Sequence, residues 1–110
     1  KAGLMSNDDE LIDRLEKAAD ESGENVWHLP SGDEYAEDMK SKIADLRNTG
    51  PRWGGASTAA AFLRQFVGEA RWAHLDIAGT AILDKDQGYL QGGASGAGVR
   101  LFTEFLRALK

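Results

Sequence analysis

The sequence of 110 residues contains no cysteine and only two prolines. Without cysteine the chain can form no disulfide framework, no thiolate nucleophile and no thiolate metal site. This composition fits a reducing compartment, and we expect a cytoplasmic protein. No apolar run approaches the roughly 20 residues that a membrane span needs, so we expect no membrane partner.

Positive charge is also scarce, because 13 Lys and Arg against 18 Asp and Glu give a formal net charge of −5. Phosphate binding needs clustered Lys and Arg, so a nucleic-acid partner is not expected. The hydrophobic content of 42% and the charged content of 28% are ordinary for a globular protein. With no internal repeat and no boundary signal, residues 1–110 are expected to form a single unit.

The first element is predicted to be a helix that is capped by Ser6 or Asn7 and ends at Gly23. Three acids at positions 8–10 crowd its first turn, where they favour the positive end of the helix dipole. The same acids could suggest calcium, but the alternating ligand spacing of a calcium loop is absent. Capping is therefore the preferred interpretation. The opening residues have no initiator Met and read as a cut end of a longer chain.

The middle of the chain is predicted to contain a short extended piece, a polar surface helix, a short strand and a very apolar helix. These elements are expected at residues 26–30, 33–42, 43–48 and 57–67. The apolar helix is expected to be buried nearly all round. After it come a strand from Trp72, an irregular segment rich in glycine and a final amphipathic helix with apolar positions from 101 to 109.

Two features of this region invite a functional interpretation and a structural one. Gly54 and Gly55 precede a helix, as in phosphate-binding loops, but the Lys and Ser/Thr of a phosphate loop are missing. A packing or loop-closure role is therefore preferred. His28, a lone histidine between apolar neighbours, is interpreted as a packing or hydrogen-bonding residue.

We expect the chain to be organised around residues 72–81, where a buried-strand pattern ends in a turn of small residues. His74 and Asp76 lie on one face of this strand and could belong to a metal site or a triad. No nucleophile stands at a diagnostic spacing, so a buried, hydrogen-bonded pair at the strand end is preferred. Asp76 is expected to fix the backbone of the turn.

Six segments together resemble the C-terminal part of the leucine (cytosol) aminopeptidase family, in the order in which that family has them. They are WAHLDIAGTA (72–81), GLMSNDDEL (3–11), VWHLP (26–30), ADLRNTG (44–50), STAAAFL (57–63) and GVRLFTEFL (98–106). The resemblance covers essentially the whole chain. It implies an α/β fold, with a partial mixed sheet flanked by helices as the C-terminal portion of the catalytic domain.

The resemblance further implies a hexameric hydrolase that removes N-terminal amino acids from peptides with two divalent metal ions, Mn or Zn. In the family the ions are held by a lysine and by carboxylates, some of them in an Asn-Thr-Asp-Ala-Glu-Gly-Arg motif. That motif occurs nowhere in this sequence. The chain is therefore expected to supply no catalytic residue and no metal ligand, and to be inactive alone.

In the family, the turn after the His-Leu-Asp-Ile strand lines the pocket for the N-terminal side chain of the substrate. The resemblance therefore assigns Ala78 and Ala81 to the wall of that substrate pocket. Some relatives carry methionine where this chain has Ala81, which implies a wider pocket here. The small residues at the strand end agree with this, because they leave room for a ligand.

Two hypotheses of different classes remain open. In the first, the residues are part of an aminopeptidase whose catalysis belongs to the complete protein, with a peptide substrate and a homo-oligomeric assembly. In the second, the chain is a non-catalytic structural or self-association module that buries exposed apolar helix faces. The sequence upstream of Lys1 would separate them, because only the first requires the acid-rich metal motif there.

Overall fold

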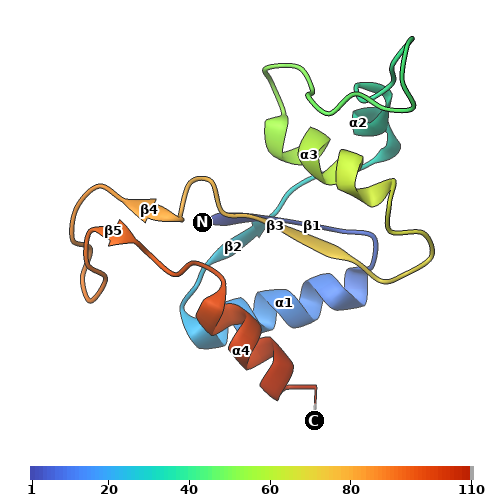
Figure 1. The fold of residues 1–110 in the computed structure, drawn as a ribbon. Helices are drawn as coiled ribbons and strands as arrows, with labels where there is room; N and C mark the ends of the chain where they lie inside the picture. Colours follow the sequence, from blue (N-terminus) through green and yellow to red (C-terminus); the bar gives the residue numbers. More distant parts are fainter. Residues whose placement is uncertain (110) are drawn as a thin grey trace.

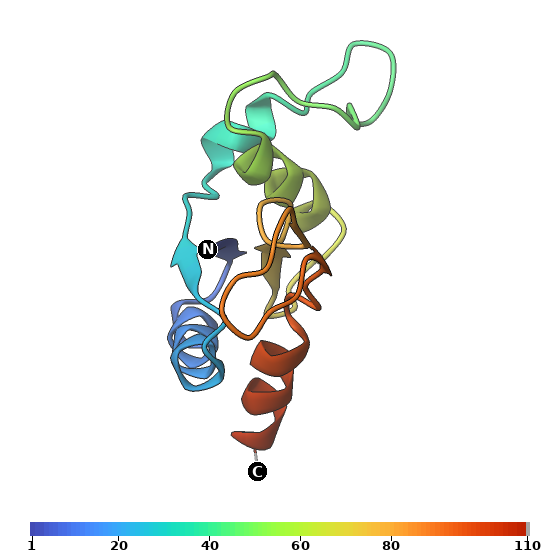
Figure 2. The same cartoon turned by 90° about the vertical axis from the view of Figure 1, so that its left-hand side faces the viewer.

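The computed structural model describes residues 1–109 and has an α/β architecture (Figure 1). Its elements follow in the order β1 (Ala2–Ser6), α1 (Asp9–Ser22), β2 (Val26–His28), α2 (Asp33–Glu37), α3 (Gly55–Arg64), β3 (Ala73–Asp76), β4 (Ile82–Leu83), β5 (Gly93–Ala94) and α4 (Val99–Arg107). Figures 1 and 2 both show α1 and α4 on one side of the main sheet and α2 and α3 on the other. The predicted mixed sheet flanked by helices is confirmed.

The main sheet has the strand order β2-β1-β3. β1 pairs in parallel with β2, with Ala2 opposite Val26, and antiparallel with β3, with Leu4 opposite Leu75. The expectation that residues 72–77 form the organising strand is therefore wrong, because β3 lies at an edge of this sheet. The centre is β1, a strand that the sequence analysis did not predict.

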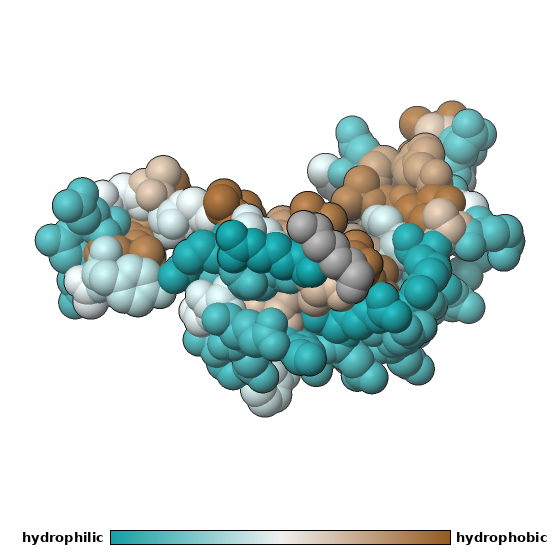
Figure 3. Space-filling view, turned by 90° about the horizontal axis from the view of Figure 1, so that it is seen from below, coloured by the Kyte–Doolittle hydropathy of each residue, from teal (hydrophilic) through white to brown (hydrophobic). Residues whose placement is uncertain are grey.

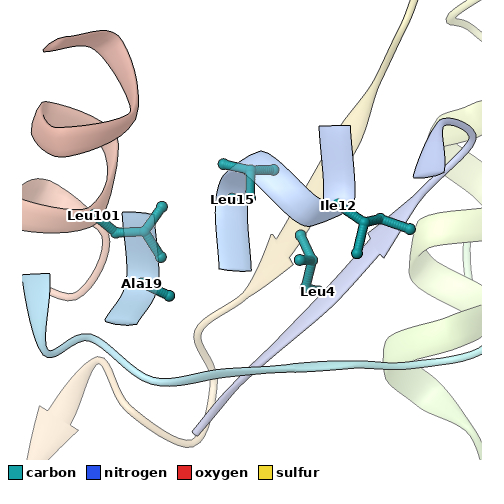
Figure 4. Packing of buried hydrophobic residues seen from close by; sticks show 5 residues of the cluster. All are labelled: Leu4, Ile12, Leu15, Ala19 and Leu101. Atoms are coloured by element: carbon teal, nitrogen blue, oxygen red, sulfur yellow. The ribbon is translucent and has the colours of Figure 1, made fainter. Parts of the chain in front are cut away.

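The buried core lies between β1, α1 and α4. One hydrophobic cluster joins Leu4 of β1, three residues of α1 and Leu101 of α4, and Figure 4 shows Leu101 beside Ala19; the α1 residues are Ile12, Leu15 and Ala19. Met5 is fully buried, and because side chains alternate along a strand it faces the opposite side of the sheet from Leu4. Both faces of β1 are thus covered, which places the central strand firmly between the helices.

The predicted first helix is confirmed as α1, and its cap is Asp8. The Asp8 carboxylate accepts a hydrogen bond from the Leu11 amide at 2.7 Å, while Gly23 ends the helix with a φ of 71°. The prediction of Ser6 or Asn7 as the cap is therefore wrong, because Ser6 ends β1 and Asp8 takes that position. The predicted first-turn charges of Asp9 and Glu10 and the predicted end at Gly23 agree with the structure.

Several predicted elements differ in the structure. The strand expected at residues 43–48 is irregular, and Ile43 is 98% exposed, since no neighbouring strand pairs with this segment within residues 1–109. The polar helix is shorter and ends at Glu37, whereas the segment expected to be irregular after Ala81 contains the β4–β5 ladder. The final helix begins at Val99.

The apolar helix α3 begins at Gly55 and is not buried all round. Gly54 is its cap residue, with a φ of 71° that glycine adopts without strain, so Ser57 lies inside the helix and not at its start. One side is buried, including Ala60 and Ala61, while Leu63 is 41% exposed. Ala59 and the side of the helix with Leu63 have no cover among residues 1–109.

Candidate functional site

The turn at residues 77–81 joins the edge strand β3 to β4. β3 is held by its antiparallel pairing with β1, in which Asp76 lies opposite Gly3 and His74 lies opposite Met5. The turn therefore starts from the end of an edge strand that is paired with the central strand β1, and its small residues follow directly from that strand end.

Local hydrogen bonds fold this turn. The Asp76 carboxylate accepts from the Ala78 amide at 2.9 Å. The carbonyl of Ile77 accepts from the amides of Thr80, at 2.9 Å, and Ala81, at 2.8 Å. The prediction that Asp76 fixes the turn backbone is confirmed. Asp76 is half-buried, however, so the expected buried environment is wrong.

A residue distant in sequence holds the other end of the turn. The Ser95 hydroxyl lies 2.5 Å from the carbonyl oxygen of Thr80 and 3.2 Å from that of Ala81. The Ser95 amide also donates to the Ala81 carbonyl at 2.9 Å, next to the β4–β5 ladder. The turn is thus attached to the loop that leads into α4.

The two predicted pocket residues differ in exposure. Ala78 is exposed and Ala81 is half-buried. A cavity of about 200 Å³ lies beside the turn and is lined by residues that include Thr80, Ser95 and Leu101, but not by Ala78 or Ala81. The two alanines therefore do not line this cavity, and the turn carries no bulky side chain at either position.

His74 has a structural environment. Its ring stacks on Trp72, with the ring centroids 6.1 Å apart and an interplanar angle of 18°. Within residues 1–109 no hydrogen bond joins its side chain to Asp76, so the expected hydrogen-bonded pair is wrong. The ring is half-buried and packs as an aromatic side chain. His28, at the end of β2, is exposed.

A second candidate site is a polar cleft of about 440 Å³ where the parallel strands β1 and β2 end. Open α/β sheets commonly bind ligands at the carboxyl ends of their strands. The lining includes side chains after each strand and from the segment after α3, among them Asn7, Asp8, Ser31, Asp33, Arg64 and Arg71. Sequence reasoning missed this cleft because it missed β1, although the short apolar run before Ser6 was a usable signal.

Both arginines of the cleft have polar partners. Arg71 contacts Asp8 at 2.7 Å and Glu10 at 3.1 Å, and the Arg64 guanidinium donates to the Ser31 carbonyl at 3.3 Å. The hydrogen bond from Arg71, with that from the Leu11 amide, holds the pKa of Asp8 below its ordinary value. The pairing favours a structural clamp between α1 and the segment before β3.

The chain carries few groups suited to metal or nucleophilic chemistry. Within residues 1–109 no three His, Asp or Glu side chains gather closely enough to hold a metal ion. In the same residues, none of the helices combines the length and the apolar character that crossing a bilayer requires. What the described site offers chemically is binding surface: a turn of small residues and a polar cleft.

Comparison with known proteins gives one consistent family. The model of the cytosol aminopeptidase family, catalytic domain, matches residues 1–103. A probable cytosol aminopeptidase of Geobacter sp. (strain M21) is 57% identical over 106 residues, which are 96% of this chain and 22% of that protein. A probable cytosol aminopeptidase of Nostoc punctiforme is 54% identical over 105 residues, which are 96% of this chain and 21% of that protein. The chain thus spans about a fifth of the length of these relatives.

Solved structures that resemble this chain agree with the family match. A tomato leucine aminopeptidase mutant has a TM-score of 0.86 at 42% identity, covering 96% of this chain and 20% of that one. The bottromycin maturation enzyme BotP, in complex with Mn, has a TM-score of 0.93 at 35% identity, covering 98% and 24%. With the family match over almost its whole length, the chain belongs to the cytosol aminopeptidase family and is a portion of that family's catalytic domain.

Proposed function

We propose that the chain is the C-terminal part of a two-metal leucyl aminopeptidase that releases N-terminal amino acids from peptides. Its role in the complete enzyme is scaffold and substrate-pocket wall. The match to the family's catalytic domain over residues 1–103 carries this proposal. The names of the relatives and the fixed turn of small residues after β3 support it.

The proposed metal ions, Mn or Zn, find no fitting set of ligands within residues 1–109. Among the described residues no cluster of three His, Asp or Glu side chains could hold an ion. We therefore assign the metal ligands to the rest of the enzyme. Ions held there would supply Lewis-acid activation of the scissile carbonyl and of water.

For the pocket itself we assign Ala78 and Ala81 to the surface that meets the substrate's N-terminal side chain. Both stand on the hydrogen-bonded turn, and neither has a side chain beyond Cβ. A pocket wall of this kind accepts a large apolar side chain because it leaves space. Specificity then depends on where the backbone of the turn lies.

Replacing Ala81 with Met in the complete enzyme tests this assignment. The longer side chain fills the pocket, so we expect kcat/KM for a phenylalanine substrate to fall about tenfold relative to that for a leucine substrate. Ala108→Met, at the exposed end of α4, is the matched control and leaves the ratio unchanged. An unaltered ratio in Ala81→Met would refute the assignment.

A homo-oligomer is the second part of the proposal, and the exposed side of α4 supports it. Val99, Phe102, Leu106 and Leu109 are 46 to 67% exposed. Apolar area of this extent favours association. If the chain is instead a non-catalytic self-association module, it forms oligomers in light scattering while the complete protein releases no amino acids.

We also propose that the complete enzyme is cytoplasmic, as the names of its relatives suggest.

A further inference from the structure

Ser95 makes an unusual set of bonds to the turn at residues 77–81. Its hydroxyl donates to the Thr80 carbonyl at 2.5 Å and accepts from the Ala97 amide at 3.1 Å, while its own amide donates to the Ala81 carbonyl at 2.9 Å. A single residue thus contacts two successive carbonyls of the turn that carries Ala78 and Ala81. These bonds fix the end of the turn opposite to Asp76.

The support behind Ser95 is itself held in place. The Glu24 carboxylate accepts from the amides of Gly98, at 2.9 Å, and Leu101, at 3.1 Å, at the beginning of α4. The Glu24 side chain is only 12% exposed, and Arg100 lies 3.4 Å from it. A carboxylate at a helix N-terminus is favoured by the free amides and by the helix dipole. The loop after β5 is therefore anchored three residues after Ser95.

The hydroxyl of Ser95 can be removed without dismantling this region. The pairing of Ile82 with Ala94 and the bond from the Ser95 amide to the Ala81 carbonyl use backbone atoms only. The bonds within the turn, from the amides of Thr80 and Ala81 to Ile77, are also unaffected. What is lost is the donor to the Thr80 carbonyl and the acceptor of the Ala97 amide, while the backbone pairing remains, so the expected change is in the position of the turn.

We propose that Ser95 is a positioning residue that holds the turn at 77–81 as a rigid wall of the substrate side-chain pocket. This inference rests on the proposed function, which assigns Ala78 and Ala81 to that wall. A fixed wall favours a large apolar side chain that contacts it over a small one that does not reach it. A wall that moves loses this preference, because the contacts of the large side chain are no longer maintained.

The test uses the complete enzyme and the p-nitroanilides of leucine and alanine. In Ser95→Ala, kcat/KM for leucine falls about fivefold, mainly through KM, since one hydrogen bond holding the wall is lost. The value for alanine stays the same. Ser95→Thr retains the hydroxyl and restores the leucine-to-alanine ratio.

Thr103→Ala is the control, because Thr103 also donates its hydroxyl to a backbone carbonyl, that of Val99 at 2.7 Å, but within α4. It leaves the ratio unchanged. An unchanged ratio in Ser95→Ala, or an equal loss for both substrates, overturns the proposal, because a merely structural role lowers both alike. If Ser95→Ala does not fold, Ser95→Cys is measured, whose thiol is a weaker donor. A ratio equal to that of the parent enzyme then overturns the proposal.

The outcomes separate this inference from the proposed function. If the parent enzyme releases no leucine, the proposed function fails and so does the inference that rests on it. If the enzyme is active and Ala81→Met changes its preference while Ser95→Ala does not, the function stands and the inference alone fails.

Discussion

At the scale of single residues, Asp8 combines two roles that act in the same direction. Its carboxylate caps α1 through the Leu11 amide and forms an ion pair with Arg71. Both interactions favour the charged carboxylate, and the bond from Arg71 contributes most to lowering its pKa. Because the pair is partly exposed, solvent screening limits its contribution.

The lowered pKa predicts a pH dependence of stability. A carboxyl with a lower pKa in the folded state stabilises the fold fully above its ordinary pKa of 3.8. That stabilisation is lost as the pH falls through the lower folded-state value. Asp8→Asn should therefore lower the urea unfolding midpoint at pH 7, and the difference from the parent should disappear in strong acid.

The control for this measurement is Asp9→Asn, since Asp9 also lies in the first turn of α1. Asp9→Asn tests whether the loss of any negative charge in the first turn of α1 lowers the unfolding midpoint as much as the loss of the Asp8 charge. A midpoint difference for Asp8→Asn that persists in strong acid, or an equal effect of Asp9→Asn at pH 7, would contradict the role assigned to Asp8.

Residue-scale features of the site were predictable where they are local. The bond between Asp76 and the Ala78 amide spans two positions, so a carboxylate before small residues was a sufficient signal. Ser95 was not predictable, because its contact with Thr80 spans 15 positions and depends on the β4–β5 pairing. Sequence reasoning assigned the glycine-rich segment to an irregular loop and so could not assign a role to its serine.

At the scale of elements, the packing of α4 on α1 is the main tertiary contact of the core. Leu101 is 1% exposed and lies next to Ala19 and Leu15. Leu101→Ala should lower the free energy of unfolding by about 2 to 5 kcal/mol, because it leaves a cavity between the helices. Denaturant unfolding followed by circular dichroism measures this change.

Leu106→Ala is the matched control on the same helix, since Leu106 is 61% exposed. Its effect should stay within about 0.5 kcal/mol. Equal destabilisation by the two substitutions would mean that α4 is not packed on α1 as described.

The element scale also explains which parts of the fold the sequence predicted. α1 was predictable because its first-turn acids, its apolar stripe and its terminating glycine are local signals within one segment, although the cap itself was placed one or two residues too early. β1 was missed because it is buried on both faces and so lacks the alternation typical of a half-buried strand. Gly3 also weakens its strand signal, yet a Cβ there would lie 2.7 Å from Leu29 Cδ1, so close packing favours glycine.

The prediction of a strand at residues 43–48 was wrong for a reason opposite to the one that hid β1. Alternation of apolar and polar residues was present, but a strand needs a partner, and none of the described strands pairs with this segment. Local pattern therefore identified helices with their own caps better than it identified strands, whose existence depends on distant pairing.

At the scale of the whole molecule, the chain is flat, with extents of 48 × 36 × 17 Å. In Figure 3, apolar patches lie between hydrophilic areas on the face seen from below. Large apolar side chains are exposed at separate places along the chain, including Trp27, Trp53, Phe66 and Ile82. Such a distribution agrees with a portion of a larger catalytic domain, which is what the family match indicates.

The central claim is that this chain contributes scaffold and pocket wall while catalysis belongs to the complete enzyme. The most direct measurement compares hydrolysis of leucine amide by the purified chain and by the complete protein, each with added manganese and with a chelator. The account predicts turnover only by the complete protein, abolished by the chelator. Turnover that co-purifies with the chain alone, or no turnover by the complete protein, would contradict it.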